Sequence, residues 1–145
     1  MFKGIRLTNT EIKHIALFES ITGATVRDCI IDEEFNRIIF VIKEGDAGIA
    51  IGKGGKNLSL LEKMTGKKHE IIEFSEDPAQ FIKNALKPAR VREIRISEKP
   101  NGETVASVHV DPRDKGIAIG KNGKNAEKVR LLAKKYFQIS NVSIV

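Results

Sequence analysis

Apolar and polar positions along this chain follow helical and strand periods, and the periods succeed one another in the same order twice. The first helical stretch begins after Thr8, which forms a capping box with Glu11, and ends at Gly23. Two stretches rich in β-branched residues follow, separated by a short acidic turn, which is typical of a β-hairpin. The pattern of the first half predicts strands over residues 24–31, 37–43 and 69–74 and helices over residues 47–51 and 56–65.

The second half of the chain repeats this order. Its hairpin is marked by the turn residues Pro100, Asn101 and Gly102 between two stretches rich in β-branched residues. We expect helices over residues 78–86, 112–119 and 124–136, and strands over residues 91–97, 104–110 and 139–145. Each half therefore predicts an α/β (α+β) fold, in which helices cover one face of a three-stranded sheet.

The apolar positions of the longer helices identify candidate core residues, because they recur at three- and four-residue spacing. They are Leu58, Leu61 and Met64 in the first half and Phe81, Ile82, Ala85, Leu86, Val129, Leu132 and Ala133 in the second. The isoleucines of the two short helices have two interpretations, since they can fill the core or line a cleft for nucleic-acid bases. We favour the core for each of Ile49, Ile51, Ile117 and Ile119.

A ten-residue motif occurs twice and indicates two related units. Residues 48–57, Gly-Ile-Ala-Ile-Gly-Lys-Gly-Gly-Lys-Asn, recur at residues 116–125 with nine of ten positions identical and an offset of 68. Asp46 and Asp114 stand before the two copies, where we expect each to cap the short helix that follows. A polar run that ends at Pro78 marks the boundary. The predicted domains are residues 1–75 and 76–145.

The repeated turn has residues suited to holding a sugar-phosphate backbone. Glycine permits positive φ and the close approach of another backbone, and the helix that follows presents free N–H groups. Lys53 and Lys56 add cations to the first turn, and Lys121 and Lys124 add them to the second. Asn122 replaces a glycine in the second turn, and asparagine tolerates the left-handed conformation.

Neither copy is a nucleotide-binding loop of the two common types. A P-loop requires four residues between its glycines and a serine or threonine after its lysine. Only three residues separate Gly48 from Gly52, and Gly54 follows Lys53. A dinucleotide fingerprint needs a third glycine where Asn57 stands.

Composition adds a charge asymmetry to this pattern. The 145 residues are 41% hydrophobic and 30% charged with a mean hydropathy of −0.22, which is typical of a globular protein and excludes a membrane-embedded or disordered chain. Residues 1–75 contain 11 basic and 11 acidic side chains, whereas residues 76–145 contain 14 and 8. The net charge of +6 favours a polyanionic partner, nucleic acid first, with the second unit as the stronger electrostatic anchor.

No residues assemble a predicted catalytic, metal or cofactor site, so we expect no enzyme and no cofactor. His14, His69 and His109 lack metal-binding spacing, and the single cysteine, Cys29, lies in a predicted strand. The acidic residues Asp32, Glu33 and Glu34 lie in the hairpin turn, where solvation explains them better than catalysis. Residues 1–6 lack the apolar stretch of a signal peptide, and no apolar run is long enough to span a membrane. We therefore expect a cytoplasmic protein.

The turn between two helices, isoleucine-Gly-x-x-Gly, resembles that of the KH domain, and the extra helix and strand before the β-α-α-β core are similar to its type II form. Residues 77–90, Asp-Pro-Ala-Gln-Phe-Ile-Lys-Asn-Ala-Leu-Lys-Pro-Ala-Arg, resemble the segment that joins two KH domains in the NusA family of transcription factors. Residues 117–125 are similar to that family's second KH loop. The resemblance covers essentially the whole chain. It fits the short archaeal members, which lack a polymerase-binding N-terminal domain and an S1 domain.

The resemblance implies two tandem type II KH domains that hold single-stranded RNA. It places the RNA-binding positions at Gly52, Lys53, Gly54, Gly55 and Lys56 in the first unit and at Gly120, Lys121, Asn122, Gly123 and Lys124 in the second. It also implies a monomer that acts in transcription termination, antitermination or pausing, with RNA polymerase as a further candidate partner. Two alternatives stay open: an interaction scaffold on the polymerase, and an RNA-binding factor in ribosome assembly or translation.

Overall fold

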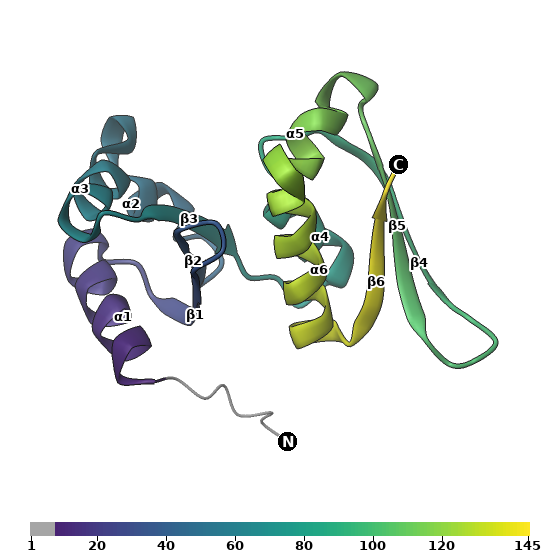
Figure 1. Ribbon diagram of the computed structural model, residues 1–145, viewed down its shortest axis with the longest axis horizontal. Coiled ribbons are helices and arrows are strands. Elements are labelled where there is room, and N and C mark those ends of the chain that lie inside the picture. The colour runs from purple at the N-terminus through teal and green to yellow at the C-terminus, as the bar shows by residue number, and fades with distance from the viewer. Residues whose placement is uncertain (1–7) are drawn as a thin grey trace. The chain divides into compact units, whose positions relative to one another are not determined.

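The computed structural model describes residues 8–145, which form two compact units that divide between Phe74 and Ser75. Residues 1–6, in which we expect no signal peptide, lie outside the described residues. Each unit has three α-helices and a three-stranded sheet, and the helices cover one face of the sheet (Figure 1). The predicted fold class is confirmed.

The first unit begins with α1 (Asn9–Thr22), and its predicted capping box is present. The backbone N–H of Glu11 donates to the hydroxyl of Thr8 (3.3 Å), and the backbone N–H of Thr8 donates to the Glu11 carboxylate (2.7 Å). Strands β1 (Val26–Asp32) and β2 (Arg37–Ile42) are antiparallel, and β3 (Lys68–Glu73) lies parallel to β2. The crossover between β2 and β3 contains α2 (Ala47–Ile51), the glycine turn and α3 (Lys56–Thr65).

The second unit has the same order and strand directions. It consists of α4 (Pro78–Leu86), β4 (Val91–Glu98), β5 (Thr104–Val110), α5 (Lys115–Ile119), α6 (Lys124–Phe137) and β6 (Ile139–Ile144). Strand β5 pairs antiparallel with β4 and parallel with β6. The helix predicted over residues 112–119 is divided, because Pro112–Asp114 forms a 3₁₀ turn before α5. The Asp111 carboxylate accepts a hydrogen bond from the backbone N–H of Arg113 (2.9 Å) and tightens this turn.

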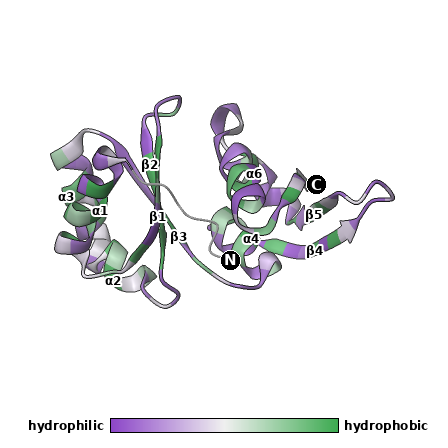
Figure 2. Ribbon diagram, turned by 90° about the horizontal axis from the view of Figure 1, so that it is seen from below, coloured by the Kyte–Doolittle hydropathy of each residue, from purple (hydrophilic) through white to green (hydrophobic). Residues whose placement is uncertain are grey.

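Each unit buries its core between its helices and its sheet. In the first unit Phe18 of α1 stacks on Phe40 of β2 with ring centroids 4.1 Å apart, and Leu61 of α3 packs in the same cluster. Hydrophobic residues occupy much of β2 (Figure 2). All core positions predicted for the second unit are buried, namely Phe81, Ile82, Ala85, Leu86, Val129, Leu132 and Ala133.

The prediction that Met64 of α3 belongs to the core is wrong. Leu61 is fully buried and Leu58 is half-buried, but 55% of Met64 is exposed. Successive steps of three residues rotate a side chain by about 60° around a helix, so Met64 lies about 120° away from Leu58. The apolar stripe of α3 therefore ends before Met64.

The buried histidine of the first unit is expected to make stability depend on pH. His69 stacks beside Phe40, and its Nδ1–H donates to the carbonyl oxygen of Lys67 (3.0 Å). Burial lowers the pKa of His69 below its usual value of 6.5. Between the lowered pKa and 6.5 the unfolded chain binds more protons than the folded one, so stability falls as the pH drops through this window.

The measurement is an NMR titration of the histidine ring signals, with the His69 signal assigned by its loss in His69→Gln. We expect the midpoint for His69 below pH 6.5. The pH dependence of thermal unfolding between pH 7.5 and 5 should also be weaker in His69→Gln than in the wild type. A midpoint at or above 6.5 would contradict the burial argument.

Candidate nucleic-acid interface

The two glycine turns have nearly the same backbone conformation. Gly52 and Gly120 end the short helices with φ of 79° in both and ψ of 168° and 165°. The third turn position is left-handed in both copies, with φ of 63° at Gly54 and 57° at Asn122. Asn122 therefore adopts the conformation for which asparagine was expected. Gly55 and Gly123 are also left-handed, with φ of 76° and 75°.

Two asparagines that sequence reasoning did not single out hold these turns together. The side-chain amide of Asn57 reaches back across the turn and donates to the carbonyl oxygen of Ile49 (2.8 Å), and Asn125 donates in the same way to Ile117 (2.8 Å). A Cβ on Gly52 would lie 2.8 Å from Cγ of Asn57. The signal was present in the sequence, since both asparagines end the repeated motif. The first glycine and the asparagine thus depend on each other.

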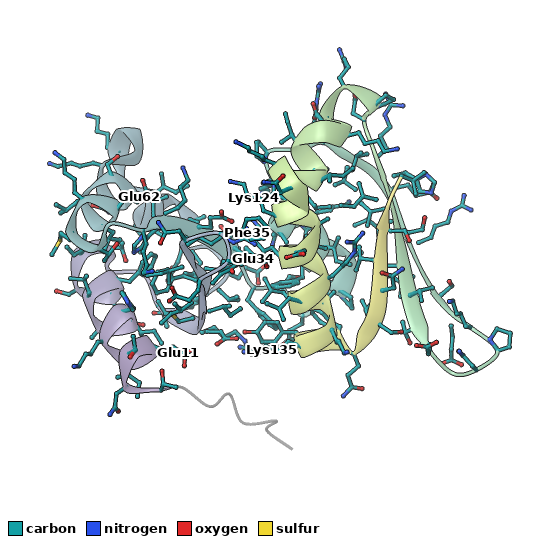
Figure 3. All side chains as sticks on the ribbon, viewed as in Figure 1. Glu11, Glu34, Phe35, Glu62, Lys124 and Lys135 are labelled. Atoms are coloured by element: carbon teal, nitrogen blue, oxygen red, sulfur yellow. The ribbon has the colours of Figure 1, made fainter. Side chains whose placement is uncertain are left out.

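The turns place lysines beside the N-termini of two helices. Lys53, Lys56 and Lys121 are exposed, and Lys124 is half-buried at the start of α6 (Figure 3). Neither α3 nor α6 has a side-chain cap on its N-terminus within residues 8–145. The backbone N–H of Lys56 donates to the carbonyl oxygen of Lys53, and that of Lys124 donates to Lys121, so these first N–H groups are used within the turns. The positive end of each helix dipole still lies beside these lysines, an arrangement that attracts an anion. The structure brings the predicted positions of each unit together in one turn.

The isoleucines beside the turns are more exposed than the core positions that we favoured for them. Ile49, Ile51 and Ile117 are 50%, 38% and 49% exposed, so these three do not fill the core, and Ile119 is half-buried. A helix of five residues has room for one inward position, and the fully buried Ala50 and Ala118 occupy it. Each turn therefore has an exposed aliphatic surface next to its lysines.

The aspartates before the short helices also act differently from the expectation. Neither makes a side-chain cap on the helix that follows it. Asp46 accepts a hydrogen bond from the backbone N–H of Thr25 (2.9 Å), and Asp114 accepts one from the backbone N–H of Arg90 (2.9 Å). Each carboxylate thus connects the start of the short helix to the residue just before the first strand of its sheet.

The second unit adds a cluster of arginines at this place. The guanidinium of Arg90 donates to Asp114 (2.8 Å), and those of Arg92 and Arg113 donate to Asp111 (3.3 Å and 3.2 Å). The hydrogen bonds from Arg90 lower the pKa of Asp114, and those from Arg113 lower the pKa of Asp111. Three exposed guanidiniums beside two buried carboxylates leave a positive charge next to α5.

The remaining polar candidates have structural roles. Cys29 is buried in β1, as its place in a strand predicted. Asp32 is not simply solvated, because it accepts a hydrogen bond from Nε of the buried Arg37 (2.7 Å).

Within residues 8–145, no three histidine, cysteine or acidic side chains are grouped so as to hold a metal ion. The helices of this part of the chain are also too short or too polar to cross a membrane.

Comparison with known proteins gives matches over both units. Residues 11–76 match the KH domain family, and residues 78–144 match the family of the NusA-like second KH domain. The crystal structure of APE1850 superposes with a TM-score of 0.82 and is 42% identical, covering 96% of this chain and all of that one.

Two curated relatives extend the match over nearly the full length. The probable transcription termination protein NusA of Halococcus morrhuae is 37% identical over 140 residues, 97% of this chain and 98% of the relative. The protein of the same name from Methanococcus vannielii is 40% identical over 141 residues, 97% of this chain and 80% of the relative. These matches confirm the resemblance found in the sequence. With its two KH domains in tandem, the chain belongs to the NusA family of transcription termination proteins.

Proposed function

We propose that this protein binds single-stranded RNA at both glycine turns and acts on transcription termination or antitermination without catalysing a reaction. The observation that carries the proposal is the pair of matching turns. Both have the same backbone conformation, both present lysines to solvent, and both lie beside exposed isoleucines.

Each turn offers RNA two kinds of contact, one with its phosphates and one with its bases. The lysines and the positive ends of the helix dipoles attract phosphates, and the glycines let the RNA backbone approach closely. Ile49 and Ile117 offer an aliphatic surface against which bases can pack. A KH turn of this kind clamps about four nucleotides. Two such clamps on one chain raise the affinity for one continuous strand through effective concentration.

The proposal extends to the setting in which the protein works. The KH domains are residues 1–75 and 76–145, and the chain acts as a monomer in the cytoplasm. RNA held across the two domains is a nascent transcript, whose capture alters pausing, and RNA polymerase is the protein partner. The NusA name of the relatives supports this setting.

Binding to RNA of different form and at different salt tests the proposal. Fluorescence anisotropy of a labelled single-stranded RNA should show binding that is weaker for the same sequence in a duplex. Because each phosphate contact with a single strand contributes about −0.7 to the slope of log K against log salt, the four lysines of the turns should contribute about −2.8 to this slope. No binding to any of a varied set of RNA sequences would contradict RNA recognition and leave the scaffold on polymerase as the better account.

A further inference from the structure

The second unit has a concave site on the face of its sheet that the helices leave open. Its volume is about 440 Å³, and strands β4, β5 and β6 all contribute to its lining. Along β5 the buried positions Ala106, Val108 and Val110 alternate with half-buried positions that line this site, among them Ser107 and His109. The site therefore lies on the other side of the sheet from the core.

The lining combines polar side chains with Val105 and Ala106, and its permanent formal charges are all positive. Arg95 and Lys99 are its permanent cations, and Ser107, His109, Asn141 and Ser143 supply hydroxyl, imidazole and amide groups. Arg95, Ser107 and Ser143 are register partners and form one row across the three strands. Such a row offers a cation and two hydroxyl groups at the spacing of neighbouring strands, about 4.8 Å.

One carboxylate orients Arg95 and leaves the rest of its guanidinium available for a ligand. Its Nε donates to the Glu93 carboxylate (2.9 Å), while the guanidinium side chain stays 71% exposed. Its two terminal amino groups have no recorded partner within residues 8–145. Glu93 does not line the site itself. The planar fork of the guanidinium is thus oriented by one carboxylate and can still bind a phosphate with its other edge.

In the first unit, the central strand of the sheet has apolar residues at the corresponding positions. Ile39 and Val41 of β2 alternate with the core residues Ile38, Phe40 and Ile42, just as Ser107 and His109 alternate with core residues of β5. Ile39 and Val41 are buried, whereas Ser107 and His109 are half-buried, so the open face with polar residues on the central strand belongs to the second unit. That unit also has the chain's whole net charge.

We propose that this open sheet face is a second contact surface for single-stranded RNA, which it holds by its phosphates and ribose hydroxyls. The inference rests on the proposed RNA binding and adds a surface separate from the glycine turns. Arg95 and Lys99 bind phosphates, and the serine hydroxyls and the amide of Asn141 bind ribose and phosphate oxygens. The site has no aromatic ring apart from the His109 imidazole, so recognition depends on the backbone and tolerates different sequences.

Charge reversal on the full-length chain tests this surface. We expect Arg95→Glu/Lys99→Glu to bind a 20-nucleotide single-stranded RNA at least about tenfold more weakly, and the salt slope to become shallower by about 1.4 because two phosphate contacts are lost. The matched control is Lys13→Glu/Lys83→Glu, which makes the same change in net charge at exposed positions of α1 and α4. A second readout needs no substitution: the His109 ring signals of the wild type should shift when RNA is added.

The outcomes separate this inference from the proposed function. If the wild type binds RNA through its turns but Arg95→Glu/Lys99→Glu binds like the control and the His109 signals stay in place, the open face does not contact RNA. The same result is expected if the face binds an acidic protein. If the wild type binds no RNA at all, the proposed function fails and this inference fails with it. If circular dichroism shows that the variant does not fold, the His109 signals decide alone.

Discussion

Placing aspartates in both glycine turns is expected to reduce RNA affinity by at least about 100-fold. The variant combines Lys53→Asp/Gly54→Asp with Lys121→Asp/Asn122→Asp, at four exposed positions. A hydrogen bond to a charged group contributes about 1.5–3 kcal/mol, so the loss of one phosphate contact in each turn already accounts for this factor. The negative charges then repel the backbone that the lysines attract. Anisotropy with a short single-stranded RNA measures the loss.

The substitutions are chosen to spare the fold. Gly54 and Asn122 are left-handed, and aspartate is among the residues that tolerate this conformation. A Cβ on Gly54 meets open space, and Asn122 is exposed and has a side chain of nearly the same size as aspartate. Circular dichroism checks folding. The control carries Lys13→Asp, Lys83→Asp and Lys134→Asp, which change the net charge by the same amount at exposed helix positions.

The single-turn variants rank the two units. Because residues 76–145 have the whole net charge of +6, Lys121→Asp/Asn122→Asp should cost more affinity and flatten the salt slope more than Lys53→Asp/Gly54→Asp. A larger loss from the first turn would reverse this ranking. If the folded combined variant binds RNA as tightly as the wild type, the turns are not clamps.

The sequence predicted the element order because its helix ends are marked by strong local signals. Thr8 with Glu11 starts α1, Gly23 ends it, and Gly66 ends α3 in the left-handed conformation. The repeated motif then predicted a turn at the same position in each unit. A single Gly-x-x-Gly would have been a much weaker signal, because glycine pairs occur in many loops. Element bounds differ from the prediction by at most two residues, except at Pro112, where a 3₁₀ turn replaces the start of a helix.

Side-chain directions in short elements could not be predicted in the same way. A helix of five residues is too short for periodicity to define its inward face, so Ile49 and Ile117 could not be distinguished from core residues. Asp46 and Asp114 stand where caps stand, but their partners lie 21 and 24 residues away in the chain. The open face of β5 did leave a signal, because Ser107 and His109 alternate with apolar residues.

Replacing the first glycine of a turn by alanine is expected to destabilise the fold by about 2–4 kcal/mol. With φ of 79° and ψ near 165°, Gly52 and Gly120 occupy a region essentially restricted to glycine, where a side chain costs about 1–3 kcal/mol. The new Cβ would also lie 2.8–3.0 Å from atoms of Asn57 or Asn125. The asparagine then gives up its hydrogen bond to the preceding helix, which adds about 1 kcal/mol.

Gly48 and Gly116 supply the matched controls within the same repeated motif. Both lie inside the short helices, and a Cβ on either meets no atom within 4 Å. Alanine there should be neutral or stabilise the fold by about 0.5–1 kcal/mol, because glycine is a poor helix former. Urea unfolding followed by circular dichroism compares Gly120→Ala with Gly116→Ala. Equal midpoints would mean that the turn relaxes around a side chain. A large difference would show that the asparagine and the glycine together fix the turn conformation on which the proposed phosphate contacts depend.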